Sequence, residues 1–389
     1  MLKSMKKRRK IYLDYASSAL PASANPGAVH ELGVKEKVKL EGARATIAKI
    51  LNARNDEIIF TSGATESNNL AILGLVQNFK NPHIVTTNIE HASVLEVCRH
   101  LENTGLARVT YVPVEVNGIV DPKKIKSALR SDTVLVSVMY ANNEIGVVEP
   151  LKEIAKEIRH YNKKNTKKQS FFRVFFHTDA TQAISYLPIN VAELGVDLMS
   201  FNNAKIYGEK GVGVLYVKKY TPVTKIMFGG EQEYGLRPGT ENVALAEGLG
   251  RALMISEKVK KREIKRVTKL RDYFFAKLSK AAFDIEINGD LKNRLPNNIN
   301  ITIPNIPSDL LVVELSERGI MACAKSACKS ASGEGSYVVN AIRMKENKEV
   351  DSEIGGVRFS LGRWTKKSDI DYTVKALSEI FTKLKKWYH

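Results

Sequence analysis

The 389-residue sequence predicts an α/β protein, with a large domain built on a mainly parallel sheet and a smaller α+β domain after it. Short apolar runs alternate with stretches of helical periodicity between residues 57 and 217. A glycine-rich loop at 228–242 and a long helix from about Val243 to Leu278 then lead into a second section. The chain is also too long for one simple core, which favours two domains.

The large domain, placed at residues 20–250, contains seven predicted strands. Each is an apolar run of four to eight residues bounded by turn signals, and the intervening stretches, such as 64–79, 90–103 and 151–164, have helical periodicity. The strands are predicted within 57–62, 83–88, 109–114, 133–140, 173–180, 196–201 and 213–217. Strands separated by helices in this way are typical of parallel sheets.

The small domain is assigned residues 1–19 and 251–389. Three apolar runs, 283–289, 297–304 and 357–361, alternate there with helical stretches at 308–319 and 368–386. This order of elements predicts an α+β unit.

The net charge of +18 comes from lysines and arginines scattered along the chain. The basic stretch 257–271 alternates charged and apolar residues at helical spacing, as a solvent-facing helix does. No nucleic-acid-binding motif accompanies it, so a solvated basic surface is favoured over direct nucleic-acid binding. Three cysteines, without paired spacing, predict neither a disulfide framework nor a metal site. The basic N-terminus lacks a following apolar segment and no window approaches a membrane span, so a cytoplasmic protein is expected.

Several predicted strands end in polar residues of the types that take part in catalysis or ligand binding. Ligands bind beyond the carboxyl ends of the strands in open α/β sheets, so these residues are expected at one edge. Taken singly, each has an ordinary explanation: the segment Thr61–Thr65 as a helix cap, Asp179 as half of an ion pair, His91 as a satisfied polar residue. Their joint occurrence with Asn143 and Lys205 favours a ligand site.

Three features of this edge match the needs of pyridoxal phosphate. The cofactor requires a lysine for its Schiff base, an acid for its ring nitrogen and an anion site for its phosphate. Lys205 and Asp179 supply the first two. The helix N-terminus in "TSGATESNN", with the hydroxyl groups of Thr61, Ser62 and Thr65, is expected to supply the third.

The sequence also resembles the NifS/IscS-like cysteine desulfurases, a branch of the class V aminotransferase family. The resemblance covers nearly the whole chain and rests on the segments "IYLDYASS", "FTSGATESNNLAI", "EHASV", "NNEIGVVEPL", "HTDATQ", "KIYGEKGVGVLYV", "RPGTEN", "SACKSASGEGSYV" and "VRFSLGRWT", in that order. It implies a fold-type-I, pyridoxal phosphate-dependent homodimer that takes sulfur from L-cysteine and leaves L-alanine.

The resemblance also implies roles for individual residues. Lys205 is the Schiff-base lysine, Asp179 pairs with the ring nitrogen, and His91 stacks on the ring and assists proton transfer. Further contacts to the cofactor are implied for Ala64, Thr65, Asn143, Gln182, Asn202 and, from the other subunit, Thr240. Arg358, together with Asn143, binds the substrate, and Arg358 clamps its carboxylate.

Cys328 is the nucleophile that the resemblance implies, forming a persulfide that passes to an acceptor protein for iron–sulfur cluster assembly or tRNA thiolation. Its local sequence supports this role, since small and polar residues surround it and Lys325 and Lys329 favour the thiolate. Cys98, inside an apolar helical stretch, is instead expected to be a buried hydrophobic residue, and Cys323 is given no role.

The sequence departs from the family pattern just before the lysine. The family has serine and histidine where this chain has Asn202 and Ala204, and both family side chains help to hold the phosphate. Losing one hydrogen bond to a charged group costs about 1.5–3 kcal/mol, which predicts weaker cofactor binding. The segment between "LDYASSALPAS" and "NPGAVHELG" is also shorter than in the family.

These departures support one alternative function, a catalytically degenerate homologue that serves as a scaffold or binding subunit in sulfur transfer. A lyase of the same fold that acts on selenocysteine is a further alternative. The full set of Lys205, Asp179, His91, Cys328 and Arg358 favours the active cysteine desulfurase.

Overall fold

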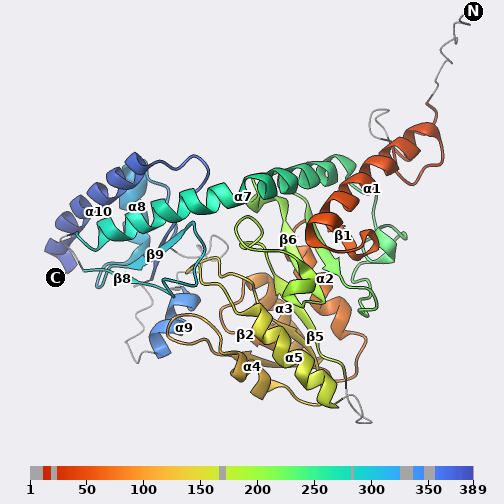
Figure 1. Ribbon diagram of the computed structural model, residues 1–389, viewed down its shortest axis with the longest axis horizontal. Helices are drawn as coiled ribbons and strands as arrows, with labels where there is room; N and C mark the ends of the chain where they lie inside the picture. The colour runs from red at the N-terminus through yellow and green to blue at the C-terminus, as the bar shows by residue number, and fades with distance from the viewer. Residues whose placement is uncertain are drawn as a thin grey trace, which may run out of the picture.

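The computed structural model describes residues 12–18, 24–165, 172–281, 284–324, 336–345 and 355–388 (Figure 1). Its larger sheet has seven strands in the order β1-β7-β6-β5-β4-β2-β3. The strands are β1 (Ile58–Thr61), β2 (His83–Thr87), β3 (Arg108–Val112), β4 (Thr133–Ser137), β5 (Phe175–Asp179), β6 (Leu198–Asn202) and β7 (Gly213–Val217). Only β7 runs antiparallel to its neighbours, so the sheet is mainly parallel, as predicted.

Successive residues of a strand point to opposite sides of the sheet. Apolar side chains therefore face both sides, and helices cover both. On one face, Val85, Val136 and Phe176 pack against α1 (Glu31–Leu51), α4 (Pro122–Ala128) and α5 (Leu151–Asn165). On the other face, the preceding residue of each strand (Ile84, Leu135, Phe175) packs against α2 (Ala64–Val76) and α3 (Ala92–Asn103). Both faces are therefore buried, which explains why consecutive residues of the central strands, such as residues 134–136 of β4, are apolar.

Short helical segments connect these elements. They are η1 (Asn55–Glu57), α6 (Val191–Leu194), η2 (Asn203–Lys205) and η3 (Glu233–Gly235). The helix η2 follows β6 directly and carries the lysine that the sequence singles out.

The helix α7 (Val243–Leu278) crosses the upper half of the view in Figure 1, from the large sheet to the smaller one. The smaller, antiparallel sheet has the order β10-β9-β8, with β8 (Glu286–Ile287), β9 (Asn298–Thr302) and β10 (Val357–Ser360). The helices α8 (Ser308–Glu317), α9 (Tyr337–Lys345) and α10 (Lys367–Tyr388) complete this part. Its core is separate from the two cores of the large sheet and includes Phe274, Ile299 and Phe359.

The elements thus agree with the predicted α/β plus α+β architecture, and α7 has the predicted bounds. The helix is continuous through residue 250, where the sequence places the domain boundary, and the domain limits stay a prediction. Within the ranges described above, no helix combines the length and apolar character that crossing a membrane requires.

The sheet topology brings several strand ends together. The strands β2, β4, β5 and β6 are parallel, and β1 runs in their direction because it pairs with β7, which is antiparallel to β6. Their carboxyl ends therefore lie at the same edge of the sheet, where α/β proteins bind their ligands.

Candidate active site

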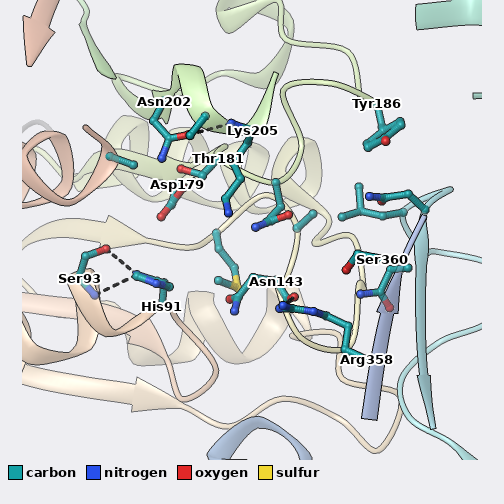
Figure 2. Close-up of a pocket in the computed structure, with 18 of the residues that line it drawn as sticks. His91, Ser93, Asn143, Asp179, Thr181, Tyr186, Asn202, Lys205, Arg358 and Ser360 are labelled. Carbon is teal, nitrogen blue, oxygen red and sulfur yellow. Dashed lines mark hydrogen bonds between the residues drawn. The ribbon is translucent and has the colours of Figure 1, made fainter. Parts of the chain in front are cut away.

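A cavity of about 540 Å³ lies at this edge, between the large sheet and β10 (Figure 2). Nine of the residues that the sequence analysis proposes for the site line it: Ala64, Thr65, His91, Asn143, Asp179, Gln182, Asn202, Lys205 and Arg358. These residues span almost 300 positions of the chain, and the fold brings them together. Their individual roles stay predictions.

Lys205 enters the cavity from the end of η2 and points into its middle (Figure 2). Two side-chain hydrogen bonds fix its backbone. Asn202 Oδ1 accepts from the Lys205 amide at 3.3 Å, and Ser185 Oγ donates to the Lys205 carbonyl at 3.0 Å. Asn202 thus has a structural role as the N-cap of η2, in addition to lining the cavity.

Asp179 is the last residue of β5 and is only 6% exposed. Its Oδ1 accepts a hydrogen bond from the Thr181 amide at 2.9 Å, and its Oδ2 accepts one from Asn68 Nδ2 at 2.8 Å. No Lys, Arg or His forms an ion pair with it in the ranges that the structure covers. A buried carboxylate is costly without a positive partner, so this position suits a protonated ring nitrogen.

His91 is the N-cap of α3, and its Nδ1 accepts a hydrogen bond from the Ser93 amide at 3.1 Å. The same Nδ1 lies 2.8 Å from Ser93 Oγ (Figure 2). Ser93 Oγ in turn accepts from Asn68 Nδ2 at 2.8 Å. One chain of hydrogen bonds therefore connects His91 with Asp179 through Ser93 and Asn68.

The N-terminus of α2 forms another wall of the cavity. Its first helical hydrogen bond runs from the Ser67 amide to the Gly63 carbonyl, so the amides of Ala64 and Thr65 have no acceptor within the helix. Such amides hold anions well. Of the three hydroxyl residues expected here, Thr65 alone lines the cavity.

The expectation for Thr61 and Ser62 is therefore wrong. Thr61 Oγ1 is bonded to Ser67 Oγ and to the Gly63 carbonyl, which turns it away from the cavity. Both residues instead line a separate hollow of about 60 Å³ that also contains Thr240. Thr240 does not line the cavity of its own chain.

Arg358 and Asn143 lie side by side on the opposite part of the cavity from Asn202 (Figure 2). Arg358 comes from β10, whose Val357 and Phe359 point into the small core, so that Arg358 points out of it. Asn143 lies in a tight turn that Asn142 stabilises, since Asn142 Oδ1 accepts from the amides of Glu144 and Ile145. Arg358 Nη1 donates to the Asn143 carbonyl at 2.6 Å.

The three cysteines have different positions. Cys328 and its flanking lysines lie outside the described residues, so its role stays a prediction. Cys98 is fully buried on α3, and burial raises the pKa of its thiol to about 12, as suits the expected hydrophobic residue. Cys323 is half-buried and forms an antiparallel bridge with Arg358 through their backbones.

The residues of the cavity fit pyridoxal phosphate. Four buried polar atoms of its lining have no hydrogen-bond partner among the described residues: Asn143 Oδ1, Thr181 Oγ1, Asn297 Oδ1 and Arg358 Nε. Unpaired buried polar atoms are costly, so these positions suit a polar ligand. The cavity also offers an amine, a buried carboxylate and a helix N-terminus, which are the groups that the cofactor requires.

Sequence reasoning did not single out several residues at the site. Asn68 and Ser93 connect Asp179 with His91, and Thr181, Tyr186 and Tyr207 line the cavity. Asn68 lies one helical turn after Ala64, and Ser93 lies two residues after a capping histidine, so both spacings contained a signal. Tyr207 adopts a positive φ of 66°, which no sequence pattern indicates.

Comparison with known proteins assigns the class. Residues 5–373 match the model of the "Aminotransferase class-V" family, and the chain belongs to this family. Its members depend on pyridoxal phosphate.

Individual relatives are named cysteine desulfurases. The chain is 41% identical to cysteine desulfurase IscS of Dictyoglomus turgidum, over 97% of this chain and 96% of the relative. It is 39% identical to the IscS of Ehrlichia chaffeensis, over 92% and 84%. Among solved structures, a NifS-like protein superposes with a TM-score of 0.83 at 33% identity, covering 93% and 92% of the two chains. A structure of SspA in complex with cysteine has a TM-score of 0.73 at 30% identity, covering 88% and 92%.

Proposed function

We propose that this protein is a pyridoxal phosphate-dependent cysteine desulfurase, which removes sulfur from L-cysteine and leaves L-alanine. The observation that carries the proposal is the presence of Lys205, Asp179 and Arg358 in one cavity. The names of the relatives support the same reaction.

Three parts of the cavity would hold the cofactor. Lys205 would bind it covalently through Nζ, and Asp179 would keep its ring nitrogen protonated. The amides of Ala64 and Thr65 and the side chain of Asn202 would bind its phosphate, while His91 and Gln182 would contact the ring and its phenolic oxygen. When bound, pyridoxal phosphate supplies an electron sink that stabilises negative charge on the substrate α-carbon.

Arg358 would orient the substrate by its carboxylate. Its Nη1 is already bonded to the Asn143 carbonyl at 2.6 Å, which fixes the guanidinium, whereas its buried Nε has no partner in the described structure. A carboxylate is the natural acceptor for a guanidinium in this situation. Asn143, whose Oδ1 is also buried and unbonded, lies beside it and would bind the amino acid as well.

The proton from the α-carbon would be taken by a group within the cavity, Lys205 Nζ or His91. The thiolate of Cys328 would then attack the substrate sulfur. An S–S bond forms, the Cβ–S bond breaks, and protonation of the remaining three-carbon unit yields alanine. Lys205 Nζ would hold the cofactor between turnovers.

The described residues that come directly before and after segment 325–335 in the chain support the role of Cys328. On one side, Cys323 pairs with Arg358, with backbone bonds of 2.7 and 3.2 Å. On the other, Ser336 Oγ donates to Glu144 Oε2 at 2.6 Å, next to Asn143 in the chain. Both flanks of the segment are thus bonded to residues at or next to the substrate position.

The protein would act as a homodimer and transfer its sulfur to an acceptor protein in the cytoplasm, for iron–sulfur cluster assembly or tRNA thiolation. The position of Thr240 supports the dimer, because Thr240 lies in a hollow outside the cavity of its own chain. Thr240 of the partner subunit would then reach the cofactor phosphate. The alternative of a degenerate scaffold is not favoured, since Lys205, Asp179, His91 and Arg358 are all in place.

The test is to supply the purified full-length protein with pyridoxal phosphate and L-cysteine and to measure alanine. Catalytic formation of alanine by the wild type, and its loss in Cys328→Ala, are expected. Alanine and sulfide release by Cys328→Ala at the wild-type rate would refute the assigned nucleophile. Parallel turnover of L-selenocysteine separates a desulfurase from a selenocysteine lyase.

A further inference from the structure

We infer that Ser93 and Asn68 are positioning residues that hold neutral His91 with its proton on Nε2. This inference rests on the proposed function only in its catalytic consequence, because the protonation of the ring is a property of the protein itself. The consequence is that His91 enters the reaction as a proton donor, which leaves removal of the α-proton to Lys205.

The first step of the argument is the orientation of Asn68. This side chain is fully buried on α2, and its Nδ2 lies 2.8 Å from Asp179 Oδ2 and 2.8 Å from Ser93 Oγ. A carboxylate can only accept hydrogen bonds, so the NH₂ end of the amide must face Asp179. Its two hydrogens are then both used, one toward Asp179 and one toward Ser93.

The second step concerns the hydroxyl group of Ser93. Because Ser93 Oγ accepts the second hydrogen of Asn68, its own hydrogen is available for the other neighbour, His91 Nδ1 at 2.8 Å. Ser93 is only 8% exposed, so water does not compete freely for this hydrogen. The hydroxyl group can therefore donate to the ring if Nδ1 carries a lone pair.

The third step is the backbone amide of Ser93, which also points at His91 Nδ1, with a distance of 3.1 Å. An amide can only donate, so Nδ1 must carry a lone pair. In a neutral imidazole the proton then resides on Nε2. The other neutral tautomer, with the proton on Nδ1, would lose the hydrogen bond from the Ser93 amide.

The same network gives Asp179 one of its two hydrogen bonds. Asn68 thus serves both ends: it stabilises the carboxylate charge of Asp179 and directs the Ser93 hydroxyl hydrogen toward His91. A network in which every member has a defined direction restricts each side chain to a single hydrogen-bonding state.

The experiment uses the full-length protein, loaded with pyridoxal phosphate and labelled with ¹⁵N in its histidines. Long-range proton–nitrogen correlation spectra report which ring nitrogen carries the proton, and His91→Gln assigns the signals. The expected result for the wild type is an unprotonated Nδ1 and a protonated Nε2. A proton on Nδ1 of His91 would overturn the inference.

Ser93→Ala removes the hydroxyl donor and keeps the amide, while Ser93→Thr retains both. The alanine variant is expected to shift the tautomer ratio of His91 about two- to ten-fold toward Nδ1–H, the effect of one neutral hydrogen bond, and to lower turnover to a similar extent. The threonine variant is expected to restore both. Unchanged spectra and turnover in Ser93→Ala would show that Ser93 does not position the ring.

A matched control exists elsewhere in the sheet. Ser137 Oγ lies 2.8 Å from Nδ1 of His177, a fully buried histidine outside the cavity. Ser137→Ala is expected to move the signals of His177 and to leave those of His91 in place. If the wild type showed the expected tautomer but formed no alanine from cysteine, the proposed function would fail while the assignment of the proton would stand.

Discussion

Arg358 Nη1 donates a 2.6 Å hydrogen bond to the main-chain oxygen of Asn143, and this bond links the small sheet to the loop after β4. The guanidinium is therefore oriented before substrate arrives. A hydrogen bond to a main-chain oxygen does not depend on the identity of the side chain at position 143. The orientation of the Arg358 guanidinium therefore depends on the path of the backbone at this position.

Replacing Arg358 with lysine is expected to weaken substrate binding specifically. Lysine keeps the charge but loses the planar fork, and one lost charge-assisted hydrogen bond corresponds to a ten- to hundred-fold change, from about 1.5–3 kcal/mol. The KM for L-cysteine should rise by roughly this factor, while the affinity for pyridoxal phosphate stays near that of the wild type. A KM within two-fold of the wild type would contradict the clamp.

Lys205→Ala is expected to abolish the covalent link to the cofactor. Lys205 Nζ is the amine at the centre of the cavity (Figure 2), so borohydride treatment followed by mass spectrometry should find pyridoxal phosphate on Lys205 in the wild type and on no residue of the variant. Lys210→Ala, in the following turn, serves as the control because Lys210 does not line the cavity. A trapped adduct elsewhere in both proteins would contradict the assignment.

Ala204→His is expected to tighten cofactor binding. Ala204 lines the cavity next to Lys205 and offers only a methyl group, whereas the family pattern has a histidine that bonds the phosphate. Regaining one such bond should raise the affinity about ten-fold or more, measured by equilibrium titration with the cofactor. Ala204→Phe controls for the added volume, and an equal effect of both substitutions would exclude the hydrogen-bond explanation.

Glu90→Gln is expected to change how stability depends on pH. Glu90 is fully buried, and burial raises the pKa of its carboxyl group from 4.5 to about 8. The folded protein therefore retains a proton between about pH 4.5 and 8 that the unfolded chain releases. As a result, wild-type stability falls with rising pH across this window, by at most about 1.4 kcal/mol per pH unit from this group.

Glutamine cannot ionise, so the variant should lack this contribution and gain stability relative to the wild type as pH rises from 4.5 to 8. Urea unfolding at several pH values measures the difference. Glu149→Gln should behave in the same direction, because burial also raises the pKa of Glu149 to about 8. Parallel pH profiles of wild type and Glu90→Gln would show that Glu90 is ionised in the folded protein.

Arg44→Met is expected to destabilise the protein by about 3–5 kcal/mol, since it leaves the buried carboxylate of Glu233 without its positive partner. Arg44 forms two hydrogen bonds, of 2.8 and 2.9 Å, with the buried carboxylate of Glu233. The exposed pair of Arg54 and Asp56 provides the control, and Arg54→Met should cost no more than about 1 kcal/mol. Equal losses of unfolding free energy in the two variants would contradict a special role for the buried pair.

The strands and the long helix were predictable because their signals are local. The apolar runs are continuous where both sheet faces are covered, and α7 begins after a glycine-rich loop and ends at the predicted residue. The strand-end positions of Asp179 and Lys205 followed from sheet geometry in the same way.

Other features depend on contacts that sequence spacing does not encode. Asn68 donates a hydrogen bond to Asp179, 111 residues away in the chain, and Arg358 donates one to Asn143, 215 residues away. Thr61 and Thr65 are both threonines at the strand-to-helix junction, yet the Thr61 hydroxyl group is hydrogen-bonded to Ser67 and Thr61 lines another hollow. Tertiary packing therefore determines which of several chemically similar side chains faces the cavity.

The continuous helix α7 contacts both η2, which carries Lys205, and β9, the neighbour of the strand that carries Arg358. At about 1.5 Å per residue, its 36 residues form a rod of about 54 Å. Because the elements on either side of the cavity pack on one continuous helix, the helix couples the position of the Lys205 amine to that of the Arg358 guanidinium. A bend in this helix between its contacts with η2 and β9 would therefore change the separation of the two groups.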